Sequence, residues 1–277
     1  MTVSAPQVPR PTSQYTEPEY VHVQGIPLAY RRQGSGEPVV LLHGHWATRR
    51  WLPFHEALAA EVDLIAPEHP GFGATPAPPD LADRADVVLF YRDALDALGL
   101  DRVHLCGYGL GGWLAADFAV WFPERVKSLA VLAPFGLRVP DAPIVDVFLL
   151  DPARYREAYF SATVDEQFAD VVPGAGTPDM GGPEEFAFRY GEMGSAARLM
   201  WERRYDTKLD RRLPRLEVPA VVVGGDQDRI VPAAHLQRWA ELLGCRVATV
   251  PGGHAFPLES PQPTARAVAD LVAEVAR

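Results

Sequence analysis

Short runs of apolar residues alternate along the chain with stretches in which apolar residues recur every three or four positions. Continuous apolar runs at residues 38–42 and 220–223 are typical of strands that are buried on both faces of a parallel sheet. Residues 85–98 instead carry their apolar side chains at helical spacing, which predicts an amphipathic helix with one buried face. Strands and helices that alternate in this way predict an α/β fold with a mostly parallel central sheet flanked by helices.

The same patterns predict the other elements of the core. Further strands are expected at 20–23, 26–30, 62–66, 102–106, 126–133 and 246–250, and further helices at 51–60, 232–243 and 263–277. The first two of these strands flank Gly25 and form a hairpin. Residues 1–18 contain Pro6, Pro9, Pro11 and Pro18 and show no periodic pattern, so we expect a disordered leader there.

The regular alternation stops between residues 136 and 213. Aromatic residues are spread here through helical-looking pieces, which glycine and proline clusters at 173–176 and 181–183 interrupt. We therefore expect a helical insertion at 136–213 that divides the core into residues 19–135 and 214–277. Most of these aromatic side chains should form the core of the insertion, and a minority should line a pocket beneath it.

Composition limits the class of protein. The 277 residues are 48% hydrophobic and 22% charged, enough for one large domain with an inserted subdomain. The net charge of −10 argues against nucleic acid and anionic membranes as partners, because both repel an acidic protein. Two cysteines, Cys106 and Cys245, and the lack of an apolar segment typical of a signal peptide or membrane span lead us to expect a cytoplasmic protein.

A glycine cluster follows the strand at 102–106 and leads directly into a helical apolar pattern, which predicts a sharp turn from strand to helix. This stretch resembles the nucleophile elbow, G-x-S-x-G, of the α/β-hydrolase superfamily, and the resemblance extends over roughly residues 20–277. Gly107 and Gly111 match the two flanking glycines, so that Gly109 occupies the position of the nucleophilic serine. Glycine cannot form an acyl-enzyme, and covalent acyl transfer through this elbow is therefore excluded.

The resemblance implies an α/β-hydrolase fold with a helical cap, and it also identifies an acid and a base. Asp228 lies in a G-x-x-D-x-x-x-P pattern after the strand at 220–223, where the superfamily has its catalytic acid, and Asp226 is the second choice. Asp226 is explained better as a turn residue near the start of the next helix. His254 lies in the loop after the last strand, where the superfamily has its catalytic histidine. Its role would be that of a general base, with Asp228 orienting the imidazole.

The loop after the strand at 38–42 matches the place where the superfamily has half of its oxyanion hole. The backbone N–H groups of His45 and Leu110 would form this hole, and His43 is expected to be structural. The side chain of His45 either points into the pocket or bonds to nearby backbone, and the sequence leaves both possibilities open. Further pocket-lining candidates are Trp46, Tyr108 and Phe256.

Residues 107–112 also satisfy the dinucleotide fingerprint G-x-G-x-x-G. That fingerprint needs an acidic residue at the end of the next strand, but the strand at 126–133 is followed by Pro134. The eight histidines are scattered, and no cysteine and histidine spacing suggests zinc. We therefore expect neither an organic cofactor nor a metal.

Three functions remain compatible with a glycine at the elbow. In the first, His254 and Asp228 carry out general acid/base catalysis next to the oxyanion hole, as in a lyase, isomerase, cyclase, cofactor-free oxygenase or direct hydrolase. In the second, the chain is a non-catalytic relative that binds a small ligand. In the third, it is an ordinary ester or C–C hydrolase whose serine has been replaced by glycine. The aromatic-rich cap favours a small hydrophobic carbonyl compound as substrate or ligand.

Overall fold

The computed structural model describes residues 14–161, 171, 182–200 and 205–277. Its core is a sheet of eight strands in the order β1-β2-β4-β3-β5-β6-β7-β8. Strands β1 and β2 are antiparallel to their neighbours, and the other neighbouring strands run parallel. The predicted mostly parallel sheet is thus confirmed. The strands are β1 (Glu19–Val23), β2 (Ile26–Gly34), β3 (Pro38–Leu42), β4 (Asp63–Pro67), β5 (Val103–Tyr108), β6 (Val126–Leu132), β7 (Ala220–Gly225) and β8 (Arg246–Val250).

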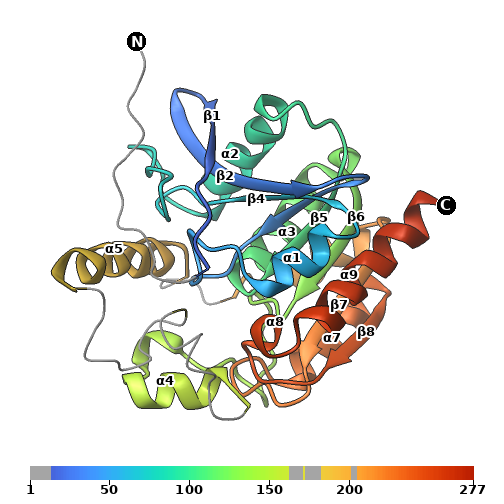
Figure 1. Ribbon diagram of the computed structural model, residues 1–277. Helices are drawn as coiled ribbons and strands as arrows, with labels where there is room; N and C mark the ends of the chain where they lie inside the picture. The colour runs from blue at the N-terminus through green and yellow to red at the C-terminus, as the bar shows by residue number, and fades with distance from the viewer. Residues whose placement is uncertain (1–13, 162–170, 172–181, 201–204) are drawn as a thin grey trace.

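Helices cover both faces of this sheet (Figure 1). On one face, α1 (Pro53–Ala59) packs against the C-terminal helix α9 (Pro261–Ala276) and the short α8 (Phe256–Glu259). On the opposite face, α2 (Arg84–Ala97) packs against α3 (Leu110–Trp121), and α7 (Ala233–Leu243) contacts β7 and β8. Nearly every residue of α3 is buried, which explains why its sequence is apolar on all sides.

Prolines set the starts of two helices that the apolar pattern had placed slightly differently. Helix α1 begins at Pro53 rather than at residue 51, because the residue before a proline is driven out of the helical region and Leu52 is extended (φ −84°, ψ 162°). Helix α9 begins at Pro261 rather than at residue 263, since proline fits the first helical position well.

Part of the predicted leader lies against the core. Residues 1–13 are outside the described residues, but Tyr15 forms a β-bridge with Arg50, and the Trp51 N–H donates to the Gln14 carbonyl at 2.7 Å. The Nε–H of Arg31 donates to the Thr16 carbonyl at 2.7 Å. Residues 14–18 are therefore held by the core instead of being disordered, because their backbone finds partners there.

The insertion begins and ends at neighbouring points. Gly136 forms a bridge with Tyr205, and the Asp206 N–H donates to the Gly136 carbonyl at 2.9 Å. Between these points the described elements are helical: η2 (Val147–Leu149), α4 (Pro152–Tyr159) and α5 (Gly182–Met200). Helices α6 (Leu209–Arg212) and η4 (Leu213–Arg215) lead back to β7, and η1 (Pro123–Arg125) precedes β6. In Figure 1, α4 and α5 lie away from the layers of helices that cover the sheet. None of the helices among the described residues is long and apolar enough to cross a bilayer.

Candidate active site

Four parallel strands end at the same edge of the sheet, and each is followed by a predicted site residue. His45 follows β3, Gly109 follows β5, Asp228 follows β7 and His254 follows β8. The carboxyl ends of parallel strands share one edge, which is the usual place for ligands in such sheets. The topology therefore brings together residues that lie up to about two hundred positions apart in the sequence.

The turn between β5 and α3 has the geometry of a nucleophile elbow. Gly109 has φ +54° and ψ −112°, and its amide and carbonyl bond to Leu132 and Phe135 at 2.9 and 3.1 Å. A β-carbon on Gly107 would lie 2.2 Å from the Gly111 carbonyl oxygen, and one on Gly111 would lie 2.0 Å from that of Leu42. Strand and helix approach so closely that both flanking positions require glycine.

The position of the nucleophile itself is less crowded. A β-carbon built on Gly109 would meet only the Phe135 ring, at 3.9 and 4.0 Å. These are ordinary van der Waals separations, so the surroundings would accept a small side chain. Leu110 is the first residue of α3, so its backbone N–H has no hydrogen-bond acceptor within the helix. Its proposed role in an oxyanion hole, together with the His45 N–H, stays a prediction.

His254 and Asp228 form a buried pair. The Nδ1–H of His254 donates to Oδ2 of Asp228 at 2.9 Å, and the two side chains are 0% and 1% exposed. Oδ1 of Asp228 accepts the backbone N–H groups of Ile230 and Val231 at 2.8 and 2.9 Å, which fixes the carboxylate. With Nδ1 protonated, the Nε2 of His254 carries a lone pair, and it is buried without a hydrogen-bond partner among the described residues.

Aromatic rings surround this imidazole. The Phe135 ring is parallel to it with centroids 5.8 Å apart, and the Tyr159 ring meets it edge-on at 5.0 Å. The Tyr108 ring lies 5.2 Å away, and its hydroxyl donates to the His254 carbonyl at 2.7 Å. The backbone of the loop is thereby tied to β5, and the imidazole lies in a region from which water is largely excluded.

The side chain of His45 lies among the same aromatic rings, and its Nε2 contacts hydroxyl groups of the cap instead of nearby backbone. It is 2% exposed, and its Nε2 lies 2.9 Å from the Tyr155 hydroxyl and 2.6 Å from the Tyr159 hydroxyl. Both tyrosines come from the cap helix α4. Burial, together with the nearby His254 and His43, lowers the pKa of His45 to about 3. The imidazole is therefore neutral at physiological pH.

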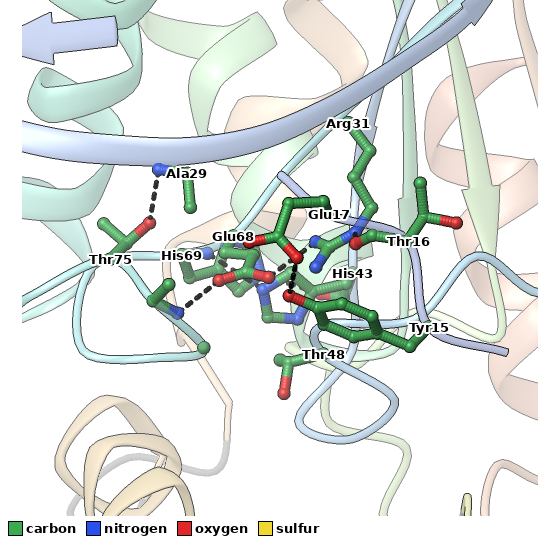
Figure 2. A network of polar contacts seen from close by, with 12 residues as sticks. Tyr15, Thr16, Glu17, Ala29, Arg31, His43, Thr48, Glu68, His69 and Thr75 are labelled. Carbon is green, nitrogen blue, oxygen red and sulfur yellow. Dashed lines mark hydrogen bonds and ion pairs between the residues drawn. The ribbon is translucent and has the colours of Figure 1, made fainter. Parts of the chain in front are cut away.

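A polar network surrounds His43, at the start of the loop that carries His45 (Figure 2). His43 packs against His69 with ring centroids 3.7 Å apart, and its Nε2 accepts the His69 backbone N–H at 2.9 Å. The Nε2–H of His69 in turn donates to the His43 carbonyl at 2.8 Å. His43 is thus structural, as the sequence suggested. Next to it, Arg31 forms a buried ion pair with Glu68 at 2.6 Å.

Helix α5 of the cap is joined to the same loop by charged groups. Arg49 forms a buried ion pair with Glu185 at 2.8 Å, and Arg189 bonds to the same carboxylate at 2.8 Å. Although burial opposes it, hydrogen bonds from these two arginines lower the pKa of Glu185. Glu192 accepts the Gly73 N–H at 2.9 Å and the Thr48 hydroxyl, and burial raises the pKa of its carboxyl.

Glu259 joins the histidine loop to the cap. Its Oε2 accepts the Gly253 N–H at 2.7 Å, and its Oε1 accepts the backbone N–H and the hydroxyl of Ser161 at 2.9 and 2.6 Å. The Ala255 N–H donates to the Tyr159 carbonyl at 2.7 Å. One carboxylate therefore fixes both the residue before His254 and the chain that leaves α4.

Three further residues that the sequence singled out are Trp46, Phe256 and Asp226. Trp46 is buried and meets the rings of Tyr108 and Tyr159 edge-on at 5.5 and 6.0 Å. Phe256 packs against Tyr108, and the centroids of the two rings lie 6.0 Å apart. Asp226 accepts the Gly252 N–H at 2.9 Å, in agreement with its interpretation as a turn residue.

Sequence reasoning missed four residues of the site: Phe135, Tyr155, Tyr159 and Glu259. The two tyrosines are four positions apart and therefore share a face of α4, which was a usable signal. Their orientation toward His45 depends on where the cap packs, and the apolar pattern does not contain that information.

Known proteins match most of the chain. Residues 39–267 match the alpha/beta hydrolase family. Over 266 residues, the chain is 29% identical to a 2-hydroxy-6-oxo-2,4-heptadienoate hydrolase of Pseudomonas putida, and the match covers 90% of this chain and 94% of that relative.

Two solved structures are similar in fold. A meta-cleavage product hydrolase from Pseudomonas fluorescens, a mutant complexed with acetates, has a TM-score of 0.73 at 21% identity over 92% of this chain and 97% of that one. A thermophilic esterase from Thermogutta terrifontis with bound malate has a TM-score of 0.69 at 21% identity over 95% and 100% of the two chains. At this level of identity the likeness shows the fold alone.

Proposed function

Because this chain belongs to the α/β-hydrolase family, we propose that it is an enzyme of that fold in which His254 and Asp228 act as a general acid/base pair without an elbow nucleophile. One observation carries the proposal: the Nε2 of His254 is buried and unpartnered among the described residues, while Asp228 holds the opposite nitrogen. An unpartnered nitrogen in a histidine that an aspartate orients is free to bind a proton, a water molecule or a ligand, which is what a general base requires.

The proposed chemistry is proton transfer. His254 takes a proton from a substrate carbon, a hydroxyl group or a water molecule, and the Asp228 carboxylate stabilises the imidazolium that results. The backbone N–H groups of His45 and Leu110 would stabilise the developing oxyanion. Because Gly109 has no side chain, the reaction passes through no acyl-enzyme. A lyase, isomerase, cyclase, cofactor-free oxygenase or direct hydrolase all fit this description.

The proposed substrate is a small hydrophobic compound that contains a carbonyl group. Rings of Tyr108, Phe135 and Tyr159 surround the imidazole and offer little to a strongly polar molecule. The name of the Pseudomonas putida relative describes a hydrolase of 2-hydroxy-6-oxo-2,4-heptadienoate, and that compound also contains a carbonyl group.

A ligand-binding protein without catalysis is the second candidate. The observation that favours it is the complete burial of His254 beneath aromatic rings, which would also suit a bound apolar molecule. Loss of the triad serine lowers the kcat of a serine protease about 2 × 10⁶-fold. A chain that has lost this serine could therefore be retained for ligand binding alone.

Paired substitutions separate these functions. Turnover of a panel of small ketones, enols and esters is measured for the wild type, His254→Ala and Gly109→Ser. The proposal predicts an activity that His254→Ala abolishes and Gly109→Ser does not improve. Esterase activity that arises only in Gly109→Ser would favour the serine-replaced hydrolase, and a tightly bound compound that is never turned over would favour the ligand-binding protein.

A further inference from the structure

Two buried imidazoles share the same neighbours in the site. The Phe135 ring lies 6.1 Å from that of His45 and 5.8 Å from that of His254. The Tyr159 ring lies 6.0 Å from the first and 5.0 Å from the second. Both histidines therefore lie in one aromatic compartment, which is defined by the rings of Phe135 and Tyr159, and Phe135 also lies beside Gly109.

Two cap hydroxyl groups, of Tyr155 and Tyr159, lie next to Nε2 of His45 and favour the tautomer in which this nitrogen accepts a hydrogen bond. The Tyr155 hydroxyl donates to the Tyr159 hydroxyl at 2.9 Å, and the Tyr159 oxygen lies 2.6 Å from Nε2 of His45. Since Tyr159 accepts from Tyr155, its own proton is free to be donated to Nε2. Burial raises the pKa of both tyrosines, so they keep these protons. A neutral imidazole that accepts at Nε2 carries its proton on Nδ1.

The Nδ1–H of His45 is a donor in need of an acceptor. Nδ1 is buried and has no hydrogen-bond partner among the described residues, as is also true of Nε2 of His254. An unpaired donor in the interior is unfavourable, and an acceptor atom of a bound ligand would satisfy it. The compartment thus presents one N–H donor, from His45, and one lone-pair base, from His254.

We propose that His45 is a second catalytic side chain, whose Nδ1–H donates a hydrogen bond to the carbonyl oxygen of an enolisable substrate while His254 removes the neighbouring acidic proton. The inference rests on the proposed function and narrows its substrate class to enolisable ketones and related dicarbonyl compounds. Tyr159 is a positioning residue, since it acts on the substrate only through His45.

The proton balance of this step is simple. The C–H bond next to the carbonyl breaks, its proton moves to Nε2 of His254, and its electron pair forms the C=C bond of an enolate. The negative charge on oxygen is stabilised by the His45 N–H, which keeps its proton. Returning the proton from His254 to the same or another carbon completes an exchange or an isomerisation without any other reactant.

The tautomer is measured first, by long-range ¹H–¹⁵N correlation spectra of wild-type protein with ¹⁵N-labelled histidine. The His45 signals, assigned through their loss in His45→Phe, should show the proton on Nδ1 at neutral pH. In Tyr159→Phe this preference should weaken, whereas Tyr91→Phe, next to His69, should leave it unchanged. A proton on Nε2 of His45 in the wild type would overturn the inference whether or not the protein is an enzyme.

Binding of 4-nitrophenolate, a stable mimic of an enolate, is measured next. The change in its absorbance on binding reports the bound fraction, and competition with phenol tests whether binding is specific. The asparagine amide nitrogen occupies roughly the place of Nδ1, so His45→Asn should bind the anion within a few-fold of the wild type. His45→Phe, which lacks the donor, should bind it about ten to a hundred times more weakly. Equal binding by His45→Phe, or no binding by the wild type, would overturn the role of His45. The His254→Ala and Gly109→Ser turnover comparison would still stand as the separate test of the proposed function.

Discussion

The edge of the Phe135 ring lies beside Gly109 and leaves space for a β-carbon on that residue. A β-carbon on Gly109 would lie 3.9 Å from the nearest Phe135 atom, whereas one on Gly107 would collide with the Gly111 carbonyl at 2.2 Å. Glycine is therefore required by packing at position 107 but not at position 109. What favours glycine at 109 is the backbone, because φ is +54° there.

The two positions should respond differently to alanine. Gly109→Ala should fold and lose about 1–3 kcal/mol of unfolding free energy, the cost of a strained backbone conformation for a residue with a side chain. Gly107→Ala should lose at least about 4 kcal/mol or fail to fold, because backbone must move. Urea unfolding of the purified variants measures both. Equal losses of unfolding free energy in the two variants would show that Gly109 has less space beside Phe135 than the structure indicates.

The Asp228 carboxylate should matter for stability as well as for the chemistry. Asp228→Ala leaves two buried backbone N–H groups and the His254 Nδ1–H without an acceptor, so we predict a loss of about 3 kcal/mol. Asp226→Ala removes a single bond to Gly252 and should cost about 1 kcal/mol. Chemical denaturation compares the two, and a harmless Asp228→Ala would mean that the pair is not formed in solution.

Buried histidines should make the protein sensitive to mild acid. Burial lowers the pKa of His43 to about 4 and those of His45 and His55 to about 3, while the unfolded chain titrates near 6.5. Below pH 6.5 the unfolded state takes up protons that the folded state cannot accept. Stability is thus fully present above pH 6.5 and is lost as the pH falls toward 4, by up to about 1.4 kcal/mol per pH unit for each histidine.

Urea unfolding at pH 7.5, 6 and 5 measures this loss. His55→Gln should reduce the slope of unfolding free energy against pH by the contribution of one proton, and His22→Gln, which changes an exposed histidine of β1, is the control variant. A free energy of unfolding that stays constant between pH 7.5 and 5 would contradict the burial of these imidazoles.

Glu259 should couple the histidine loop to the cap. Glu259→Gln replaces one acceptor oxygen by a donor and so loses a bond either to Gly253 or to Ser161. We predict faster hydrogen exchange at the amides of residues 253 and 161, together with a lower kcat. Glu274→Gln, which breaks an exposed pair with Arg246, is the matched control and should change neither. Unchanged exchange in Glu259→Gln would show that the two segments are fixed independently.

Much of the fold could be predicted from apolar patterning. The strand β3 has the predicted limits, because a continuous apolar run bounded by turn residues allows few alternatives, and β8 also has its predicted limits. Gly107 and Gly111 identified the elbow because close contact between strand and helix leaves room only for glycine. The resemblance to the superfamily, through the pattern around Asp228 and the loop around His254, indicated this pair, and the two side chains lie 2.9 Å apart.

The walls of the site could not be predicted in this way. Tyr155 and Tyr159 were visible as cap aromatics, but their contact with His45 depends on how an insertion packs on the sheet. Phe135 follows β6 directly, and only the turn geometry directs its ring toward His254. Side-chain direction after the end of an element is set by tertiary contacts, which no local pattern encodes.

The central claim is that a base and an oxyanion hole are assembled around a position that lacks a nucleophile. A fluorophosphonate reagent, which labels an activated serine covalently, tests this claim most directly when labelling is followed by mass spectrometry of the intact protein. The account predicts no adduct at the elbow of the wild type, one adduct in Gly109→Ser, and no adduct in the double variant that also carries His254→Ala. A folded Gly109→Ser protein that stays unlabelled would contradict it.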